Sequence, residues 1–140
     1  DVIVGFPGET DAEHAASLDF CREIGFSRLH VFRYSRRAGT KAAGQPDQVD
    51  PRVINARSQD MLLLAGQLAL SYHSAQVGRD HLVLLEQLRD DGYFEGYTPE
   101  YVPVRLPTSP GLAAGQIVRA TGAFAGQDFL LCHNAKPGCS

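Results

Sequence analysis

The first ten residues constrain the fold more than any other stretch, because they combine a strand, a tight turn and the start of a helix. The run Val2–Val4 is β-branched, as in a strand buried on both faces of a parallel sheet. Gly5 and Gly8 allow a turn with positive φ, and Thr10 with Glu13 fits a helix capping box. Ligands of such βα units lie beyond the carboxyl ends of the strands. The turn therefore either faces a pocket or simply reverses the chain.

A second strand is predicted at residues 28–34, after a helix at residues 11–24. A helix of this length is a crossover connection, so the two strands should be parallel and their loops should share one rim. Five basic side chains and no acid lie between Ile24 and Pro46: Arg28, Arg33, Arg36, Arg37 and Lys41. This excess suits a phosphate backbone, and it equally suits a solvated loop.

The predicted secondary structure of the rest of the chain changes at Gly78, from a long helix to short strands. Asp50 and Pro51 predict the N-cap and first residue of a long helix that continues to Ala75. Five short strands separated by turn residues then predict a small antiparallel barrel of the OB-like kind, an all-β part after an α/β part. These strands are expected at residues 81–86, 93–97, 101–106, 116–121 and 128–132.

Composition indicates the class of protein and the cellular compartment to expect. Its 140 residues are 44% hydrophobic and 21% charged, which is ordinary for a globular protein. Three cysteines, an odd and small number, argue against a disulfide scaffold and favour the cytoplasm. We expect no signal peptide and no membrane span, because the apolar segment at residues 61–70 is short and interrupted. The missing initiator methionine and the opening on a buried-type strand suggest a fragment of a longer protein.

Residues 1–10 and 30–40 resemble the end of the catalytic barrel in the radical S-adenosylmethionine (SAM) methylthiotransferases. The resemblance implies that residues 1–77 hold the fifth and sixth strands of a partial (β/α) barrel, followed by the long helix. It also implies that backbone groups and apolar side chains at the ends of both strands bind SAM. By position these cofactor-binding residues are Ile3, Gly5, Glu9, Phe32, Tyr34 and Ser35.

Residues 96–104 resemble the most recognisable segment of the TRAM domain, a small RNA-binding barrel, which we place at residues 78–133 before a tail at 134–140. The segment implies tRNA as partner. The candidate RNA-binding residues are Arg33, Arg36, Arg37, Lys41, Tyr97, Tyr101, Arg105 and Arg119. From Gly78 onward, however, five basic residues face seven acids, a net charge of 5 − 7 = −2. The tyrosines then either stack on RNA bases or only pack the sheet, and both interpretations stay open.

The family's chemistry requires two 4Fe-4S clusters, one of them bound by three closely spaced cysteines. No such triplet occurs here, so we place the cluster ligands upstream, assign no catalytic residue or metal ligand to this chain, and predict that it is inactive alone. Cys132, His133 and Cys139 lack the paired spacing of a zinc site.

The resemblance implies an enzyme that adds a methylthio group to C2 of N6-threonylcarbamoyladenosine next to the anticodon, with an electron donor protein as a second partner. Two alternatives remain open. One is a methylthiotransferase acting on a ribosomal-protein aspartate, and the other is a non-catalytic RNA-binding module.

Overall fold

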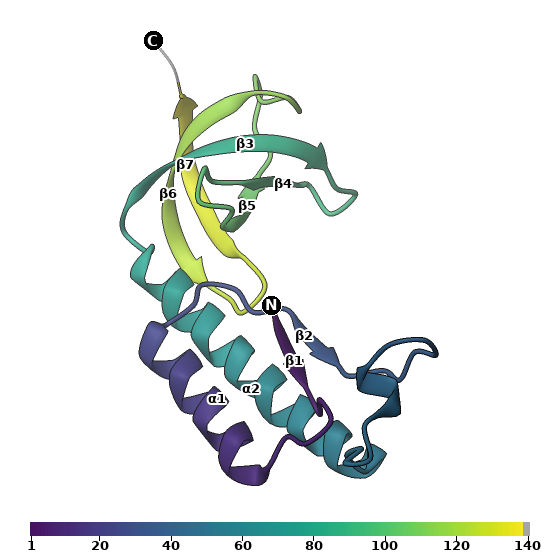
Figure 1. Ribbon diagram of the computed structural model, residues 1–140. Helices are drawn as coiled ribbons and strands as arrows, with labels where there is room; N and C mark the ends of the chain where they lie inside the picture. The colour runs from purple at the N-terminus through teal and green to yellow at the C-terminus, as the bar shows by residue number, and fades with distance from the viewer. Residues whose placement is uncertain (139–140) are drawn as a thin grey trace. The chain divides into compact units, whose positions relative to one another are not determined.

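The computed structural model describes residues 1–138, which form two compact units, Asp1–Ala69 and the part of the chain from Leu70 on. In the first unit, β1 (Val2–Val4) pairs in parallel with β2 (Val31–Arg33), and α1 (Asp11–Ile24) connects them. Figure 1 shows β1 and β2 side by side. The predicted parallel βαβ unit is confirmed, although β2 is shorter than expected, because the strand register covers only Val31–Arg33 of the predicted residues 28–34.

The ends of α1 follow from its sequence. The Thr10 hydroxyl accepts the Glu13 amide at 3.1 Å, and the Glu13 carboxylate accepts the Thr10 amide at 2.9 Å, which confirms the predicted capping box. Gly25 ends the helix in the left-handed region at φ 68°.

The long helix α2 (Pro51–Ala75) has the predicted bounds and follows a short 3₁₀ turn, η1 (Ala42–Gly44). Asp50 precedes it, and its carboxylate accepts the Arg52 amide at 2.8 Å. Met61 and Leu64 bury their side chains against Val4 and Cys21, so both helices cover the same face of the two strands. Among the described residues, no helix has the length and apolar character needed to cross a membrane.

The second unit is a closed five-stranded barrel. Its strands are β3 (Asp80–Leu88), β4 (Tyr93–Tyr97), β5 (Pro103–Pro107), β6 (Ile117–Ala125) and β7 (Leu130–Pro137). They follow the order β3-β4-β5-β7-β6 around the barrel, so the OB-like prediction is confirmed. Ten buried residues fill its interior, Phe94, Leu85, Leu106 and Leu130 being among the largest.

The prediction of a purely antiparallel barrel is wrong at one strand pair. β5 and β7 run parallel, with Val104 opposite Leu130 and Arg105 opposite Leu131. The β6–β7 hairpin supplies the closing strand, and β7 returns alongside β5 in the same direction. Local sequence patterns predict strands but not which strand closes the barrel.

Two predicted strand ends are also corrected. β5 begins at Pro103, because Tyr101 adopts φ 63° in a turn between Thr98 and Val102 and cannot continue a strand. β7 extends to Pro137, so residues 134–137, expected in the tail, pair with β6 instead. The register of β6 against β7 is irregular between Arg119 and Thr121 and again between Gly122 and Phe124, a feature that is common at the rims of barrels.

Candidate functional site

One face of the β1–β2 sheet is free of helices and carries two of the predicted cofactor-binding residues. Val4 is 1% exposed on the helix side, whereas Ile3 and Phe32 are 57% and 53% exposed. Ile3 lies opposite Phe32 in the strand register, so alternation along each strand places both side chains on the face away from the helices. Two apolar side chains therefore lie side by side where a planar apolar group can pack.

The two glycines of the β1–α1 turn are needed for packing and backbone geometry. Gly5 has φ 76°, and a Cβ there would collide with the Ile54 side chain of α2. Gly8 has φ 86° and donates its amide to the Asp47 carbonyl at 2.9 Å. The positive φ predicted for both glycines is confirmed, and the backbone at Gly5 lies close to a helix of the same chain.

Glu9 is held by the protein itself. Its Oε1 atom accepts the Gly5 amide at 2.9 Å and Arg57 Nη1 at 2.8 Å, and its side chain is only 13% exposed. Arg57 also donates to the Glu9 carbonyl at 2.9 Å and to the Asp11 carboxylate at 2.8 Å. The hydrogen bond to Asp11 raises the pKa of Arg57 against the opposing effect of burial. Glu9 therefore fixes the turn, and only its remaining oxygen is free of these bonds.

Arg57 was not among the predicted residues, although a signal for it exists. It follows Ile54 by three residues and precedes Met61 by four, so it occupies one position of the apolar stripe of α2. A charged residue at such a position is buried and needs a charged partner. Arg57 is 6% exposed, as this argument requires.

Tyr34 and Ser35 continue the rim after β2. The Tyr34 amide donates to the Val4 carbonyl at 2.8 Å, and the ring packs edge-on against Phe6 at 5.5 Å between centroids. The Tyr34 hydroxyl is buried and has no hydrogen-bond partner among the described residues. Ser35 is exposed. The rim thus offers apolar surface, backbone groups and one hydroxyl without a protein partner among the described residues.

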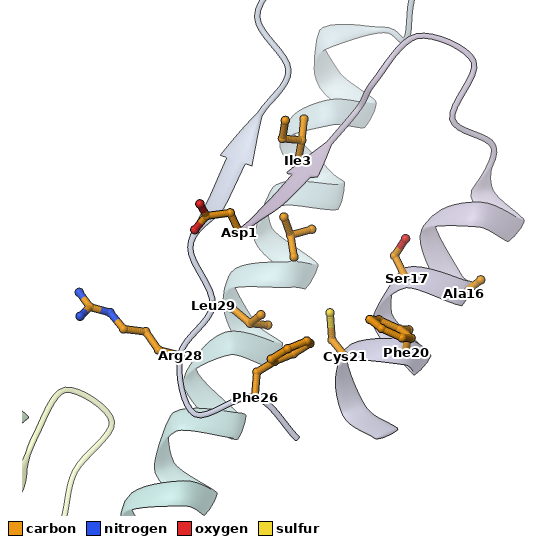
Figure 2. A pocket seen from close by; sticks show the side chains of 10 residues that line it. Asp1, Ile3, Ala16, Ser17, Phe20, Cys21, Phe26, Arg28 and Leu29 are labelled. Carbon is orange, nitrogen blue, oxygen red and sulfur yellow. The ribbon is translucent and has the colours of Figure 1, made fainter. Parts of the chain in front are cut away.

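A groove of about 520 Å³ lies along β1 and α1 (Figure 2), and it shares only Ile3 with the predicted cofactor-binding residues. Phe20, Cys21 and Phe26 form much of its wall, and the two phenylalanine rings lie 6.3 Å apart. The predicted rim is therefore a surface different from this groove.

The basic loop after β2 presents its charges unequally. Arg33 donates weakly to Asn55 at 3.4 Å, and Arg36 donates to the Ala43 carbonyl at 2.8 Å. Arg37 and Lys41 are exposed and form no ion pair with any side chain in residues 1–138. These two charges are the most available to an anion.

The four predicted RNA-binding residues of the barrel also differ in how available they are to a ligand. Tyr97 is 37% exposed at the end of β4, and Tyr101 is 78% exposed in the following turn. Arg119 is exposed on β6. Arg105 differs, because its guanidinium pairs with Asp91 and lies 4.9 Å from the centre of the Tyr93 ring. The charge of Arg105 is therefore already matched.

The cysteines of the described chain are core residues. Cys21 and Cys132 are 3% and 0% exposed, and both are free thiols. Burial raises the pKa of Cys132 to about 11, which opposes thiolate formation and metal binding. Residues 1–138 contain no group of three potential metal ligands, and Cys139 lies outside the described residues.

The sequence matches no protein-family model. It is 39% identical to tRNA-2-methylthio-N(6)-dimethylallyladenosine synthase of Sphingopyxis alaskensis over 93% of this chain and 29% of the relative. It is also 39% identical to threonylcarbamoyladenosine tRNA methylthiotransferase MtaB of Bacillus subtilis, over 92% of this chain and 29% of the relative. Ribosomal protein uS12 methylthiotransferase RimO of Roseiflexus castenholzii is 44% identical over 60% of this chain and 17% of the relative.

Proposed function

The chain belongs to the methylthiotransferase family, and we propose that it serves as the C-terminal segment of a tRNA methylthiotransferase. One observation carries this proposal: 39% identity over more than nine-tenths of the chain to two relatives that are both named for tRNA methylthio modification. Because the chain spans 29% of the length of those relatives, the activity belongs to the whole protein rather than to this segment.

We assign residues 1–77 to the end of a radical SAM barrel and residues 78–137 to a TRAM-like barrel, which includes the whole of β7. The parallel β1–β2 pair with both helices on one face supports the first assignment, and the closed five-stranded barrel supports the second. A cytoplasmic location and an electron donor protein complete the proposal, since the reaction requires reducing electrons.

SAM, together with two 4Fe-4S clusters whose ligands we place in the rest of the protein, would supply the radical chemistry. The described residues have a binding role. Ile3 and Phe32 pack against the adenosine, and the backbone around Gly5 and Ser35 offers polar groups to it. The buried Tyr34 hydroxyl, which lacks a protein partner, is a candidate donor to the same ligand. Glu9 contributes by fixing the turn through Gly5 and Arg57.

The proposed substrate is N6-threonylcarbamoyladenosine in tRNA. The resemblance of residues 96–104 and the similarity to the Bacillus subtilis relative support this base. The Sphingopyxis alaskensis relative, equally identical but named for dimethylallyladenosine, makes that base the second candidate. The third is a ribosomal protein, supported by the relative from Roseiflexus castenholzii.

The test is mass spectrometry of tRNA nucleosides from cells with and without the full-length gene. We expect 2-methylthio-N6-threonylcarbamoyladenosine to disappear in the deletion and to return on complementation. Loss of the dimethylallyl nucleoside instead would select the second base. An unchanged nucleoside profile with loss of the methylthio group from a ribosomal-protein aspartate would replace tRNA by the third substrate.

A further inference from the structure

The strand order of the barrel is that of an OB fold, and in OB folds one particular surface binds nucleic acids. In OB folds, the second and third strands and the loops that follow strands one and four bind oligonucleotides. Here these elements are β4, β5, the β3–β4 turn at Asp91 and the β6–β7 loop that contains Phe129. All four meet on the exterior of the barrel around Arg105.

Arg105 projects outward, since its neighbours Val104 and Leu106 are both buried in the barrel core. Its guanidinium carbon lies 4.9 Å from the centre of the Tyr93 ring and 5.4 Å from that of Phe129. Its Nε atom is buried without a hydrogen-bond partner among the described residues. Two rings therefore hold a planar cation in one orientation, and its hydrogen-bonding capacity is only partly used.

The only described acid that pairs with Arg105 comes from the β3–β4 turn. The Asp91 carboxylate accepts a hydrogen bond from Arg105 Nη2, and Asp91 Oδ1 also accepts the Tyr93 amide at 3.2 Å. The hydrogen bond from Arg105 holds the pKa of Asp91 below its usual value, so the pair is ionic at neutral pH. Asp91 is about half exposed, with 52% of its side chain accessible, and can release the guanidinium without unfolding a core.

A carboxylate and a phosphate present similar oxygen geometry to a guanidinium. We propose that the exterior of β4 and β5 around Arg105 binds single-stranded RNA, and that an RNA phosphate replaces the Asp91 carboxylate on Arg105. This inference rests on the proposed function and names the binding surface. Tyr97 lies on the same side of β4 about 13 Å beyond Tyr93 by strand rise, and its exposed ring can stack on a base.

This pairing also explains how a barrel with a net charge of −2 binds a polyanion. In the free protein, the Asp91 carboxylate neutralises Arg105. Arg105 becomes available to RNA only when a phosphate that fits the site displaces this carboxylate. A protein partner would use the same aromatic surface without a phosphate, so its binding would not depend on this exchange. The salt dependence of binding separates the two partners.

The experiment compares Asp91→Asn with Asp90→Asn in the full-length protein. Both variants remove one negative charge from the same turn, but Asp90 is exposed and pairs with no described side chain. Asparagine at position 91 keeps an oxygen for the Tyr93 amide, so the turn should persist. The probe is a fluorescein-labelled anticodon stem-loop RNA, titrated at several salt concentrations and followed by fluorescence anisotropy.

We expect Asp91→Asn to bind the RNA about three- to tenfold more tightly, because the competing carboxylate is gone. The salt slope should stay the same, because Arg105 contacts one phosphate in both proteins. Asp90→Asn should change affinity less than about twofold, since an exposed, unpaired charge acts through screened long-range attraction. Arg105→Gln should weaken binding about tenfold, and adding Asp91→Asn to it should restore nothing.

Equal affinities of wild type and Asp91→Asn, or an equal gain in Asp90→Asn, would overturn the inference. A gain from Asp91→Asn that survives in the double variant would also overturn it, because the effect would not pass through Arg105. Absence of RNA binding in every variant rejects this surface as well. The nucleoside analysis of the deletion strain is independent of these titrations, so the proposed function stands or fails separately.

Discussion

Arg57 is the residue on which the β1–α1 turn depends. It comes from α2, far along the chain, yet its guanidinium contacts the backbone and side chain of Glu9 and the side chain of Asp11. Because Glu9 in turn accepts the Gly5 amide, one buried cation links the start of α1 to the turn that carries the proposed cofactor rim.

Arg57→Met should therefore destabilise the first unit by about 2 kcal/mol, since it leaves the poorly solvated Glu9 carboxylate without its cation. The measurement is a urea titration followed by hydrogen exchange and mass spectrometry of peptides from residues 1–69. Arg52→Met is the control, because the Arg52 side chain is 92% exposed and its ion pair should contribute less than about 0.5 kcal/mol. Equal losses in both variants would show that the buried network contributes no more stability than an exposed ion pair.

At the scale of elements, close backbone approach shapes the barrel. Gly96 of β4 lies opposite Leu85 of β3, beside a register irregularity between Leu85 and Gln87. A Cβ on Gly96 would collide with the Leu84 carbonyl, which belongs to the backbone and cannot rotate away. Glycine at this position therefore lets β3 and β4 pair tightly where the barrel curves.

Gly96→Ala should lower the stability of the barrel by about 1–3 kcal/mol, the usual range for added volume in a packed core. Gly44→Ala is the matched control, because nothing lies within 4 Å of a Cβ there and its φ is not positive. Thermal unfolding followed by circular dichroism compares the two. A melting temperature unchanged in Gly96→Ala would mean that β3 can shift at no cost.

Different turns of α2 pack into different cores, which is again a feature of a whole element. Met61 and Leu64 pack in the first unit, whereas Tyr72 packs against the barrel core. His73 is 4% exposed and its Nδ1 lies 2.7 Å from the Gly126 carbonyl, within the second unit. The last turns of α2 therefore belong to the barrel, and the earlier turns to the strands.

At the scale of the whole molecule, each compact unit carries one proposed site. The rim with Ile3 and Phe32 lies in the first unit, and the exterior around Arg105 lies in the second. Since each unit has its own buried core, a substitution on one surface should leave the other site intact.

We therefore expect two separable variants of the full-length protein. Phe32→Ala should weaken SAM binding several-fold and leave affinity for the anticodon stem-loop RNA unchanged. Arg105→Gln should weaken RNA binding about tenfold and leave SAM binding unchanged. Equilibrium dialysis with SAM and anisotropy with the RNA measure the two affinities. Loss of both affinities in either variant would contradict the division of roles.

Local sequence patterns determined the parts of this protein that depend on near neighbours. The capping box of Thr10 and Glu13, the parallel βα unit, the bounds of α2 and the presence of five barrel strands were all predictable. Each depends on side-chain periodicity or on residues within a few positions of one another. The family resemblance also depended on such short stretches, since residues 1–10, 30–40 and 96–104 carried it.

Only the tertiary structure decided which distant groups meet. Nothing within a few residues of Glu9 names Arg57 as its partner, and nothing near Arg105 in sequence names Asp91 or Phe129. The parallel pairing of β5 with β7 likewise follows from closing the barrel. The physical reason is the same in all three cases: hydrogen bonds, ion pairs and strand pairing between distant segments depend on the chain path, which local periodicity does not specify.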